Sequence, residues 1–424
     1  MKILWLCNIV LPKVAKKIND GYSFFGGWLV GLSDSLAQAD GYELCVCSPL
    51  CSSDKVIDGE TDGLKYYCFP QGKHNNSGDL PALEQYFESI LKKEKPDIVH
   101  IFGTEYIHTL AMVNTCKKLD IIDKTIIQIQ GILYYYLEHY CAGLPENIDF
   151  YNKTLHDIKR KESEKKRKED FEKRSVYELE AFKQVKHIIG RTDFDRAFAY
   201  NTNPNAKYHF CNESLRDSFY NNSWDIEKCQ RHSIFVSQCS YPIKGFHYLL
   251  KAMPEILKKY PDTHIYTTGT NLKSDKIIEQ QTFTSYGMYL HKLIIKYGLR
   301  EHITFLGELD EQKMCESFLK ANVFVSPSTI ENSPNSVGEA MLLGVPVVSS
   351  DVGGVKNMLT HGEEGYLYQY DADYMLTYYV CKMFDDEENA KRMSANAKKH
   401  AQNTHNRENN LQTLLKIYND IAEM

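Results

Sequence analysis

The sequence predicts an α/β fold built from two doubly wound domains. Short apolar runs alternate with longer helical patterns along the chain, and this alternation starts again after Arg231. Strands that are buried on both faces read as continuous apolar runs, and parallel strands need a crossover, usually a helix. With 424 residues, the chain is long enough for two such domains.

Each half of the chain contains its own series of predicted strands and helices. The apolar runs predict strands in the first half at Ile3–Cys7, Glu43–Ser48, Tyr66–Phe69, Asp97–Phe102, Thr125–Gln130, His187–Gly190 and Tyr208–Cys211. In the second half they predict strands at Ser233–Ser237, His264–Thr267, Ile303–Leu306, Val323–Ser326 and Pro346–Ser349. Helical spacing predicts helices at Gly27–Ala39, Leu83–Lys93, Tyr106–Lys118, Gly245–Lys258 and Ser336–Leu343.

Turn-rich sequence between Asn201 and Gln230 marks the boundary between the halves. We therefore expect an N-terminal domain over residues 1–210, including a charged helical segment at 152–185, and a C-terminal domain over residues 211–405. Residues 406–424 carry apolar side chains at helical spacing, which predicts an amphipathic helix.

The composition indicates a globular protein without a metal or disulfide framework. The chain is 43% hydrophobic, and its formal net charge of -6 disfavours a nucleic-acid partner. Its 12 cysteines include no C-x-x-C pair, so we expect no structural zinc. The apolar runs are too short for a signal peptide or a membrane span. We expect a cytoplasmic protein, and peripheral contact with the inner face of a membrane stays open.

Residues 158–174 interrupt the alternation. They carry nine Lys or Arg and five Asp or Glu, a net charge of +4, and Tyr134, Tyr135 and Tyr136 shortly precede them. One interpretation is a solvated helix whose opposite charges pair three and four positions apart. The other is a basic surface for anionic lipid headgroups or for a diphosphate-linked acceptor.

The densest chemical motif is the stretch 328–341, which reads STIENSPNSVGEAM. A predicted strand leads into a polar loop and then into a helix, and α/β sheets bind ligands at such carboxyl ends of strands. The free N–H groups and positive dipole end of a helix start attract phosphate. Ser333 and Asn335 are expected to cap this helix or to donate to phosphate oxygens.

Two carboxylates flank this loop. Glu331 lies within the loop, and Glu339 lies about one turn inside the helix. Carboxylates accept hydrogen bonds from hydroxyl groups, so a ligand with a sugar, a diphosphate and a ribose would fit between them. That ligand is a nucleotide sugar. The structural alternative is an acidic helix start without a ligand, because acids favour this end of the helix dipole.

The stretch from Glu331 to Glu339, followed by AMLLGVPVV, resembles the E-x7-E signature of retaining GT-B glycosyltransferases, and most of all glycosyltransferase family 4. Phe305-Leu306-Gly307, the FVSPS of 324–328 and Gly353-Gly354 also fit. The resemblance is specific over about residues 233–368 and architectural before them. It implies two Rossmann-like domains facing a central cleft, with the acceptor on the N-terminal side, the donor on the C-terminal side and the final helix crossing back.

The resemblance implies a role for each matching position. Glu331 would contact the donor sugar and Glu339 the ribose. The diphosphate would be held by the loop positions Asn332, Ser333, Pro334, Asn335 and Ser336. The positions near the base would be Gly307, Glu308 and Leu309. Gly26 and Gly27 match a glycine-rich turn that brings backbone N–H groups to the diphosphate, here after a long loop from Asn8 to Phe25.

Two positions depart from the family pattern. Lys244-Gly245 matches its basic motif, G-R-L-x-x-x-K-G, but Gln238 occupies the arginine position. Lys244 would therefore be the main side-chain cation on the leaving diphosphate. Gln130 stands where the family often has a cleft histidine, which leaves His108 and Arg191 as the candidate cleft groups.

The resemblance implies a retaining glycosyltransferase that moves a sugar from a nucleoside diphosphate to a hydroxyl of a glycan or glycolipid, in surface polysaccharide synthesis. No metal and no cofactor are expected, since catalysis would rest on positioning and on electrostatic stabilisation of the departing diphosphate. A nucleotide-sugar 2-epimerase of the same architecture is one alternative. A non-catalytic sugar-nucleotide binder, which the glutamine at 238 makes plausible, is the other.

Overall fold

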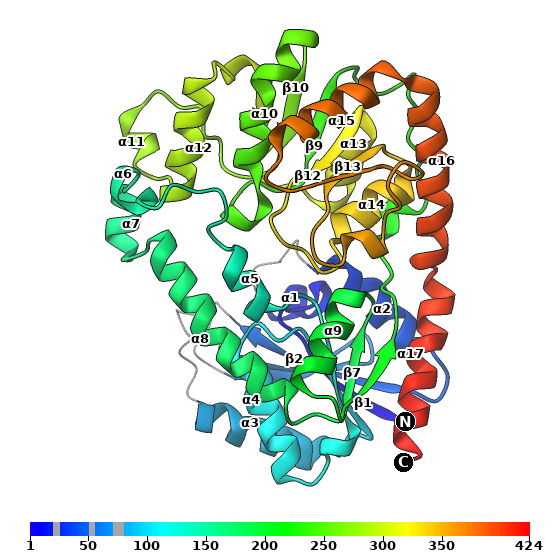
Figure 1. Cartoon of the computed structure of the whole chain (residues 1–424). Helices are drawn as coiled ribbons and strands as arrows, with labels where there is room; N and C mark the ends of the chain where they lie inside the picture. The colour runs from blue at the N-terminus through cyan, green and yellow to red at the C-terminus, as the bar shows by residue number, and fades with distance from the viewer. Residues whose placement is uncertain (20–25, 51–55, 71–79) are drawn as a thin grey trace. The chain divides into compact units, whose positions relative to one another are not determined.

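The computed structural model describes residues 1–19, 26–50, 56–70 and 80–424, which divide into two compact units (Figure 1). The first unit consists of Met1–Tyr134, Asp170–Arg216 and His405–Met424. The second consists of Tyr135–Glu169 and Asp217–Thr404. Each unit has one sheet with helices packed on it, which confirms the predicted pair of Rossmann-like α/β domains. No helix within the described ranges is long and apolar enough to cross a membrane.

The sheet of the first unit has eight strands in the order β3-β4-β2-β1-β5-β6-β7-β8. Its strands are β1 (Lys2–Leu6), β2 (Glu43–Leu50), β3 (Ile57–Thr61), β4 (Leu64–Pro70), β5 (Ile98–Phe102), β6 (Thr125–Gln128), β7 (His187–Gly190) and β8 (Lys207–Phe210). All neighbours run parallel except β3 and β4. The seven predicted strands are confirmed, and β3 is an addition, because its mostly exposed, polar sequence has no apolar run.

Helices of the first unit lie between successive strands of this sheet, apart from the last, which follows all the strands. They are α1 (Pro12–Ile18), α2 (Gly27–Ala37), α3 (Leu80–Glu94), α4 (Ile107–Lys118), α9 (Asp193–Thr202) and α17 (Arg407–Ala422). Helix α1 lies in the stretch from Asn8 to Phe25 that was predicted to be a loop, and Pro12 starts it at the first helical position. The last part of that stretch, residues 20–25, lies outside the described residues.

The sheet of the second unit has six parallel strands in the order β11-β10-β9-β12-β13-β14. They are β9 (Ser233–Val236), β10 (His264–Thr267), β11 (Ile303–Phe305), β12 (Val323–Ser326), β13 (Val347–Ser350) and β14 (Tyr366–Tyr368). The helices include α10 (Phe246–Lys259), α11 (Ile277–Gln280), α12 (Ser285–Lys296), α13 (Glu311–Lys320), α14 (Asn335–Leu343), α15 (Asp373–Asp385) and α16 (Glu387–Thr404). The five predicted strands are confirmed.

Both sheets reverse their strand order once. In the second unit the chain fills one side as β9, β10 and β11, and then returns to the other side of β9 with β12. In the first unit the same reversal falls between β1 and β5. Loops on the two sides of a reversal diverge, which opens a crevice at the carboxyl ends of the two strands, the usual ligand site of such sheets.

The segment 135–169 leaves the first sheet after β6 and packs on the second unit. It forms the end of α5 (Leu133–His139), α6 (Ile148–Tyr151), α7 (Leu155–Arg160) and the start of α8 (Glu164–Phe182). Thr154 donates to the Phe283 carbonyl, and Ser285 donates to the Asp157 carboxylate. The sequence-based boundaries kept all of 152–185 within the N-terminal domain. In the structure, the part up to Glu169 belongs to the second unit.

The C-terminal helix α17 completes the core of the first unit. Tyr418 is fully buried and accepts a hydrogen bond from the Trp5 indole at 3.1 Å. Its hydroxyl oxygen also lies 2.6 Å from Nδ1 of His100. Burial lowers the pKa of His100 to about 3, so the neutral imidazole can accept the hydroxyl proton of Tyr418. One hydroxyl thus satisfies buried groups on β1 and β5.

We predict that Tyr418→Phe destabilises the protein by about 1–3 kcal/mol, because it leaves the Trp5 N–H and the His100 nitrogen buried without this partner. Urea unfolding followed by circular dichroism measures the loss. Tyr42→Phe is the control, since the Tyr42 hydroxyl bonds to Asn419 of the same helix at an exposed position. Equal changes in the two variants would contradict this account.

Candidate functional site

The strand reversal of the second unit brings together the loop after β9 and the loop after β12. Lys244, from the first loop, makes an ion pair with Glu331, from the second, with Nζ and Oε1 2.6 Å apart. Ser328 donates to the same carboxylate oxygen at 2.8 Å. Glu331 is buried, at 7% exposure. Two residues singled out in the sequence for one ligand are therefore in direct contact.

The charges of this pair depend on each other. Burial opposes the charge of Lys244, but the Glu331 carboxylate outweighs that effect and raises the pKa of the ammonium above its ordinary value. The Lys244 ammonium also lies 5.7 Å from the centre of the Tyr241 ring. The site thus holds a lysine that stays charged in the neutral range.

Two glycines let the loops pack this closely. Gly245 has φ +66°, and a Cβ there would overlap the carbonyl oxygen of Pro327. Gly353 has φ +51°, and a Cβ there would overlap the carbonyl oxygen of Glu331. Any L side chain would meet both the steric clash and the strain of a left-handed backbone. These glycines therefore fix the backbone on both sides of the ion pair.

The start of helix α14 follows the same loop. The N-cap residue is Pro334, and within the described part of the chain no side chain caps the helix. Of the two roles expected for Ser333 and Asn335, capping is therefore not observed, and the Ser333 hydroxyl contacts the Met358 sulfur at 3.4 Å. Donation to phosphate oxygens stays a prediction. Without a side-chain cap, the first-turn N–H groups suit an anion. Glu339 lies one turn further on and is buried.

Tyr136, which the sequence suggested only as part of a basic surface, lies at the loop after β12. Its hydroxyl accepts a hydrogen bond of 3.0 Å from the backbone N–H of Asn332, next to Glu331. Nearby, Thr329 donates to the His139 carbonyl at 3.2 Å. Helix α5 thus supports the loop between Glu331 and α14. Only the cluster of tyrosines before the charged segment marked this region in the sequence.

The remaining predicted positions of this unit follow other strands of the sheet. Gln238 lies just beyond β9 and is half-buried. Gly307 follows β11 with φ +72°, and its carbonyl accepts from the Gly269 N–H at 3.0 Å. Glu308 and Leu309 come directly after it. Because parallel strands point the same way, these positions share the carboxyl edge of the sheet with Glu331.

Gly26 and Gly27 lie in the first unit, at the start of α2. Gly26 has φ +76°, and a Cβ there would overlap the Ile9 side chain, while a Cβ on Gly27 would meet the Arg216 side chain. The turn is therefore tightly packed against its own unit. His108, of the same unit, is buried and bonds to the Asn8 side chain at 2.8 Å. Burial lowers its pKa to about 3, so it is neutral.

His108 belongs to a cluster at the strand reversal of the first unit. The Asn8 amide follows β1 and joins His108 to the carboxylate of Glu105, which follows β5. Burial raises the pKa of Glu105 above its ordinary value. The sequence pointed to His108 alone, because Asn8 and Glu105 match no motif. This cluster occupies the first unit's equivalent of the Lys244 and Glu331 position.

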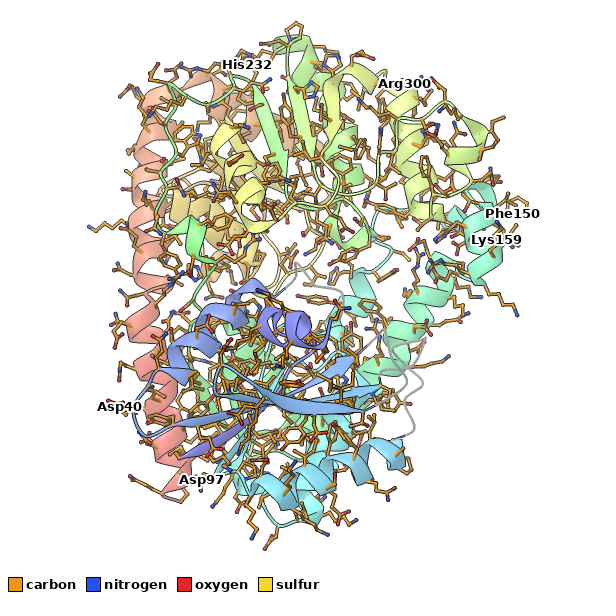
Figure 2. All side chains as sticks on the ribbon, turned by 180° about the vertical axis from the view of Figure 1, so that it is seen from behind. Asp40, Asp97, Phe150, Lys159, His232 and Arg300 are labelled. Carbon is orange, nitrogen blue, oxygen red and sulfur yellow. The ribbon has the colours of Figure 1, made fainter. Side chains whose placement is uncertain are left out.

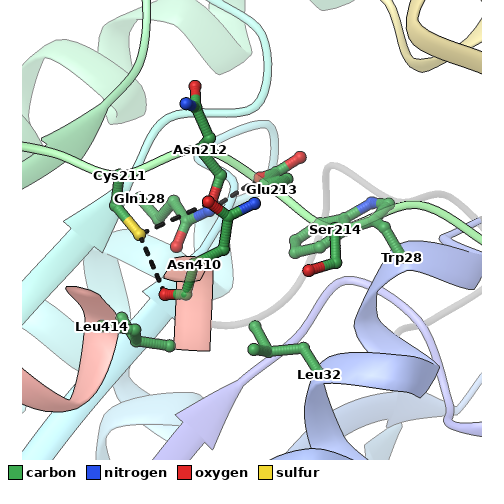
Figure 3. A pocket seen from close by; sticks show the side chains of 9 residues that line it. All are labelled: Trp28, Leu32, Gln128, Cys211, Asn212, Glu213, Ser214, Asn410 and Leu414. Atoms are coloured by element: carbon green, nitrogen blue, oxygen red, sulfur yellow. Dashed lines mark hydrogen bonds between the residues drawn. The ribbon is translucent and has the colours of Figure 1, made fainter. Parts of the chain in front are cut away.

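Arg191 lies after β7 and is paired with Glu213, with Nη1 and Oε1 3.0 Å apart. The Gln128 and Gln130 side chains also donate to Glu213. Figure 3 shows Glu213 and Gln128 lining a pocket together with Trp28, Leu32, Cys211, Asn212, Ser214, Asn410 and Leu414. The structure therefore gives Arg191 a buried partner at the carboxyl edge of its own sheet.

Comparisons with known proteins find sequence similarity to glycosyltransferases over part of the chain. Residues 218–400 match the model of the family described as glycosyl transferases group 1. An uncharacterized glycosyltransferase of Methanocaldococcus jannaschii is 26% identical over 206 residues, which are 48% of this chain and 49% of the relative. A phosphatidyl-myo-inositol mannosyltransferase of Mycobacterium leprae is 31% identical over 135 residues, 32% of each chain. The chain thus spans half or less of these curated relatives.

A solved structure extends the similarity to the whole chain. The Anabaena protein HepE, in complex with UDP and glucose, has a TM-score of 0.66 and 14% identity, covering 99% of this chain and 100% of its own. The fold is therefore of the GT-B type, as predicted. The family match and these relatives support the resemblance to GT-B glycosyltransferases of the family 4 type.

We predict that Tyr136→Phe loosens the loop that it supports. The variant keeps the ring and removes only the oxygen that accepts from Asn332. Losing a neutral hydrogen bond of about 1 kcal/mol should speed amide exchange of residues 328–335 about 5-fold. Hydrogen exchange with mass spectrometry measures this, with Tyr374→Phe as the exposed control. Unchanged exchange in this peptide would contradict a supporting role for Tyr136.

Proposed function

We propose that this protein is a retaining glycosyltransferase that transfers a sugar from a nucleoside diphosphate to a hydroxyl of a glycan or glycolipid. The observation that carries the proposal is the ion pair of Lys244 and Glu331 beside an uncapped helix start, at the strand reversal of the second unit. This combination offers a cation and helix N–H groups to a diphosphate, and a carboxylate to a sugar.

The donor would lie along the carboxyl edge of the second sheet. The start of α14, at Asn335 and Ser336, and the ammonium of Lys244 would bind the diphosphate. Glu331 would accept hydrogen bonds from the sugar hydroxyls and Glu339 from the ribose. The base would lie beside Gly307, Glu308 and Leu309. The UDP and glucose in the Anabaena structure support nucleotide sugars as the first donors to test.

Catalysis would depend on positive groups that the fold already holds near the diphosphate before the reaction begins. As the bond from sugar to phosphate breaks, the departing diphosphate gains negative charge, and fixed positive groups stabilise it. The acceptor oxygen would bond to the anomeric carbon on the face that the diphosphate leaves, while a phosphate oxygen accepts the proton of that hydroxyl, so the configuration is retained. This route uses no metal, no cofactor and no protein nucleophile.

The acceptor would bind to the first unit. There His108 and Arg191 follow β5 and β7 at one edge of a parallel sheet. Gly26-Gly27 follow β1 at the same edge and would offer backbone N–H groups to the donor diphosphate. The neutral imidazole of His108 can exchange hydrogen bonds with a hydroxyl. Similarity to a phosphatidyl-myo-inositol mannosyltransferase supports a lipid-linked acceptor. A role in surface polysaccharide synthesis and contact with a membrane are further parts of this proposal.

Two alternative functions remain for this architecture. One is a nucleotide-sugar 2-epimerase, and the other is a sugar-nucleotide binder without catalytic activity. A thermal-shift screen with nucleoside diphosphates and their sugars identifies the donor, because a true ligand stabilises the protein by mass action. Incubating the protein with the donor alone then distinguishes a glycosyltransferase from an epimerase, since an epimerase makes a new nucleotide sugar without an acceptor. Failure of every nucleotide sugar to stabilise the protein would refute all three.

We predict different effects for the two glutamates. Glu339→Ala should weaken binding of the free nucleoside diphosphate by about 1.5–3 kcal/mol, because it removes a charge-assisted bond to the ribose. Glu331→Ala should spare that affinity and reduce turnover, because its partner is the sugar. Calorimetric titration of both variants with the diphosphate measures this difference. Equal losses in the two variants would disprove the assignment of roles.

We predict that Lys244→Ala lowers turnover on the order of 10²–10³-fold, by analogy with the loss of one preorganised oxyanion donor. Gln238→Arg is the complementary variant, because it adds a second cation at the carboxyl end of β9. It should raise diphosphate affinity and partly rescue Lys244→Ala. The melting temperature of each variant controls for misfolding, since Lys244→Ala leaves Glu331 with a buried charge. Near-native turnover of a folded Lys244→Ala would remove Lys244 from the diphosphate site.

A further inference from the structure

The segment 135–169 and the neighbouring helix α11 expose an unusual amount of apolar surface. Six of the fifteen large apolar residues that are exposed in the described part of the chain come from these two segments. They are Phe150 (80% exposed), Tyr151 (66%), Leu155 (50%), Ile158 (55%), Ile277 (72%) and Ile278 (84%). We call these six residues the apolar face. Exposed apolar side chains gathered in one region mark an interaction site.

The two segments that carry the apolar face are joined to each other. The N–H of His156 donates to the Gln281 carbonyl, and the N–H of Leu155 donates to the Gln281 side chain. Gln281 is the C-terminal cap of α11, so α7 begins where α11 ends. Lys292 of α12 donates to the Tyr151 carbonyl and ties α6 to the same region. Figure 1 shows α6, α7, α11 and α12 together in the second unit.

Unpaired cations border the apolar face. Lys153, Lys159, Arg160 and Lys161 are exposed and form no salt bridge within the described part of the chain. Figure 2 shows Phe150 and Lys159 at the same outer edge. The acidic residue among them, Asp157, is buried and bonded to Thr154 and Ser285. The solvent-facing charge of α7 is therefore positive.

The charged part of α8 differs from this surface. Arg167 there is bonded to both Glu162 and Glu164. Tyr136, another residue of the predicted basic surface, is bonded to the loop after β12. Arg167 is therefore engaged within the protein, whereas Lys165 and Lys166 of α8 are exposed like the cations of α7. Of these two helices, only α7 carries residues of the apolar face.

We propose that the apolar face docks on an anionic phospholipid bilayer, with Phe150, Ile277 and Ile278 inserted among the acyl chains and Lys159 to Lys161 at the phosphates. Apolar side chains next to lysine and arginine suit the boundary between headgroups and acyl chains. A second copy of the chain fits less well, because a two-fold contact through this face would bring the cations of the two copies together. This deepens the proposed membrane contact by naming its surface and lipid class.

Vesicle flotation tests the proposal without a donor or acceptor, so its result is independent of the proposed glycosyl transfer. The native protein should float with vesicles of phosphatidylcholine and phosphatidylglycerol, and much less with phosphatidylcholine alone or in high salt. Lys159→Gln with Arg160→Gln should lower the partition coefficient on the order of 10-fold. Phe150→Ser with Ile278→Ser should lower it by at least as much.

Matched variants elsewhere on the second unit provide the controls. Tyr374→Ser replaces an equally exposed aromatic residue on α15, and Lys258→Gln replaces an exposed lysine on α10. Both should float like the native protein, and melting temperatures should show that all variants are folded. The proposal is overturned if the native protein fails to float at low salt, or if the face variants float as well as the controls. It is equally overturned if Phe150→Ser with Ile278→Ser converts a native dimer to a monomer without reducing flotation.

Discussion

Parallel strand pairing is the constraint on which the rest of this molecule depends. It forces every strand-to-helix loop of a unit to the same edge of its sheet, and one reversal of strand order opens that edge to a ligand. In the second unit the reversal lies between β9 and β12, where Lys244 meets Glu331. In the first it lies between β1 and β5, where Asn8 joins His108 to Glu105. Both clusters thus have the same topological origin.

The ion pair of the second unit holds the lysine and the glutamate of the candidate site in direct contact. A buried pair gains Coulomb energy but loses hydration, so the balance is close to neutral for stability. Lys244 is then available to a phosphate at little cost, provided that Glu331 finds hydroxyl donors in exchange. Ser328 already supplies one such donor. In the proposed function, Lys244 would exchange its contact with Glu331 for a contact with the diphosphate.

The sequence predicted the parts of the fold that depend on apolar patterning, and missed those that depend on a tertiary context. Twelve strands follow from buried apolar runs. The three-residue strand β14 is buried as well but was not predicted, and β3 has polar residues and is formed by pairing with β4. Glu331, Lys244 and Glu339 could be identified because they belong to a motif. Tyr136 could not, because its contact with Asn332 spans 196 positions of sequence. Whether Ser333 caps helix α14 could not be predicted either, because its hydroxyl contacts the sulfur of Met358, which lies 25 positions further along the chain.

The discontinuous composition of both units has a consequence for synthesis on the ribosome. Trp5 and His100 are synthesised well before their partner Tyr418, which lies 413 and 318 positions further along the chain. Ile148 emerges before any strand of the second unit and belongs to that unit's core. Neither unit can therefore reach its final packing when its first sheet strands leave the exit tunnel. The nascent chain must keep apolar surface of the first sheet exposed until α17 has been made, which makes early chaperone engagement an expected part of its biogenesis.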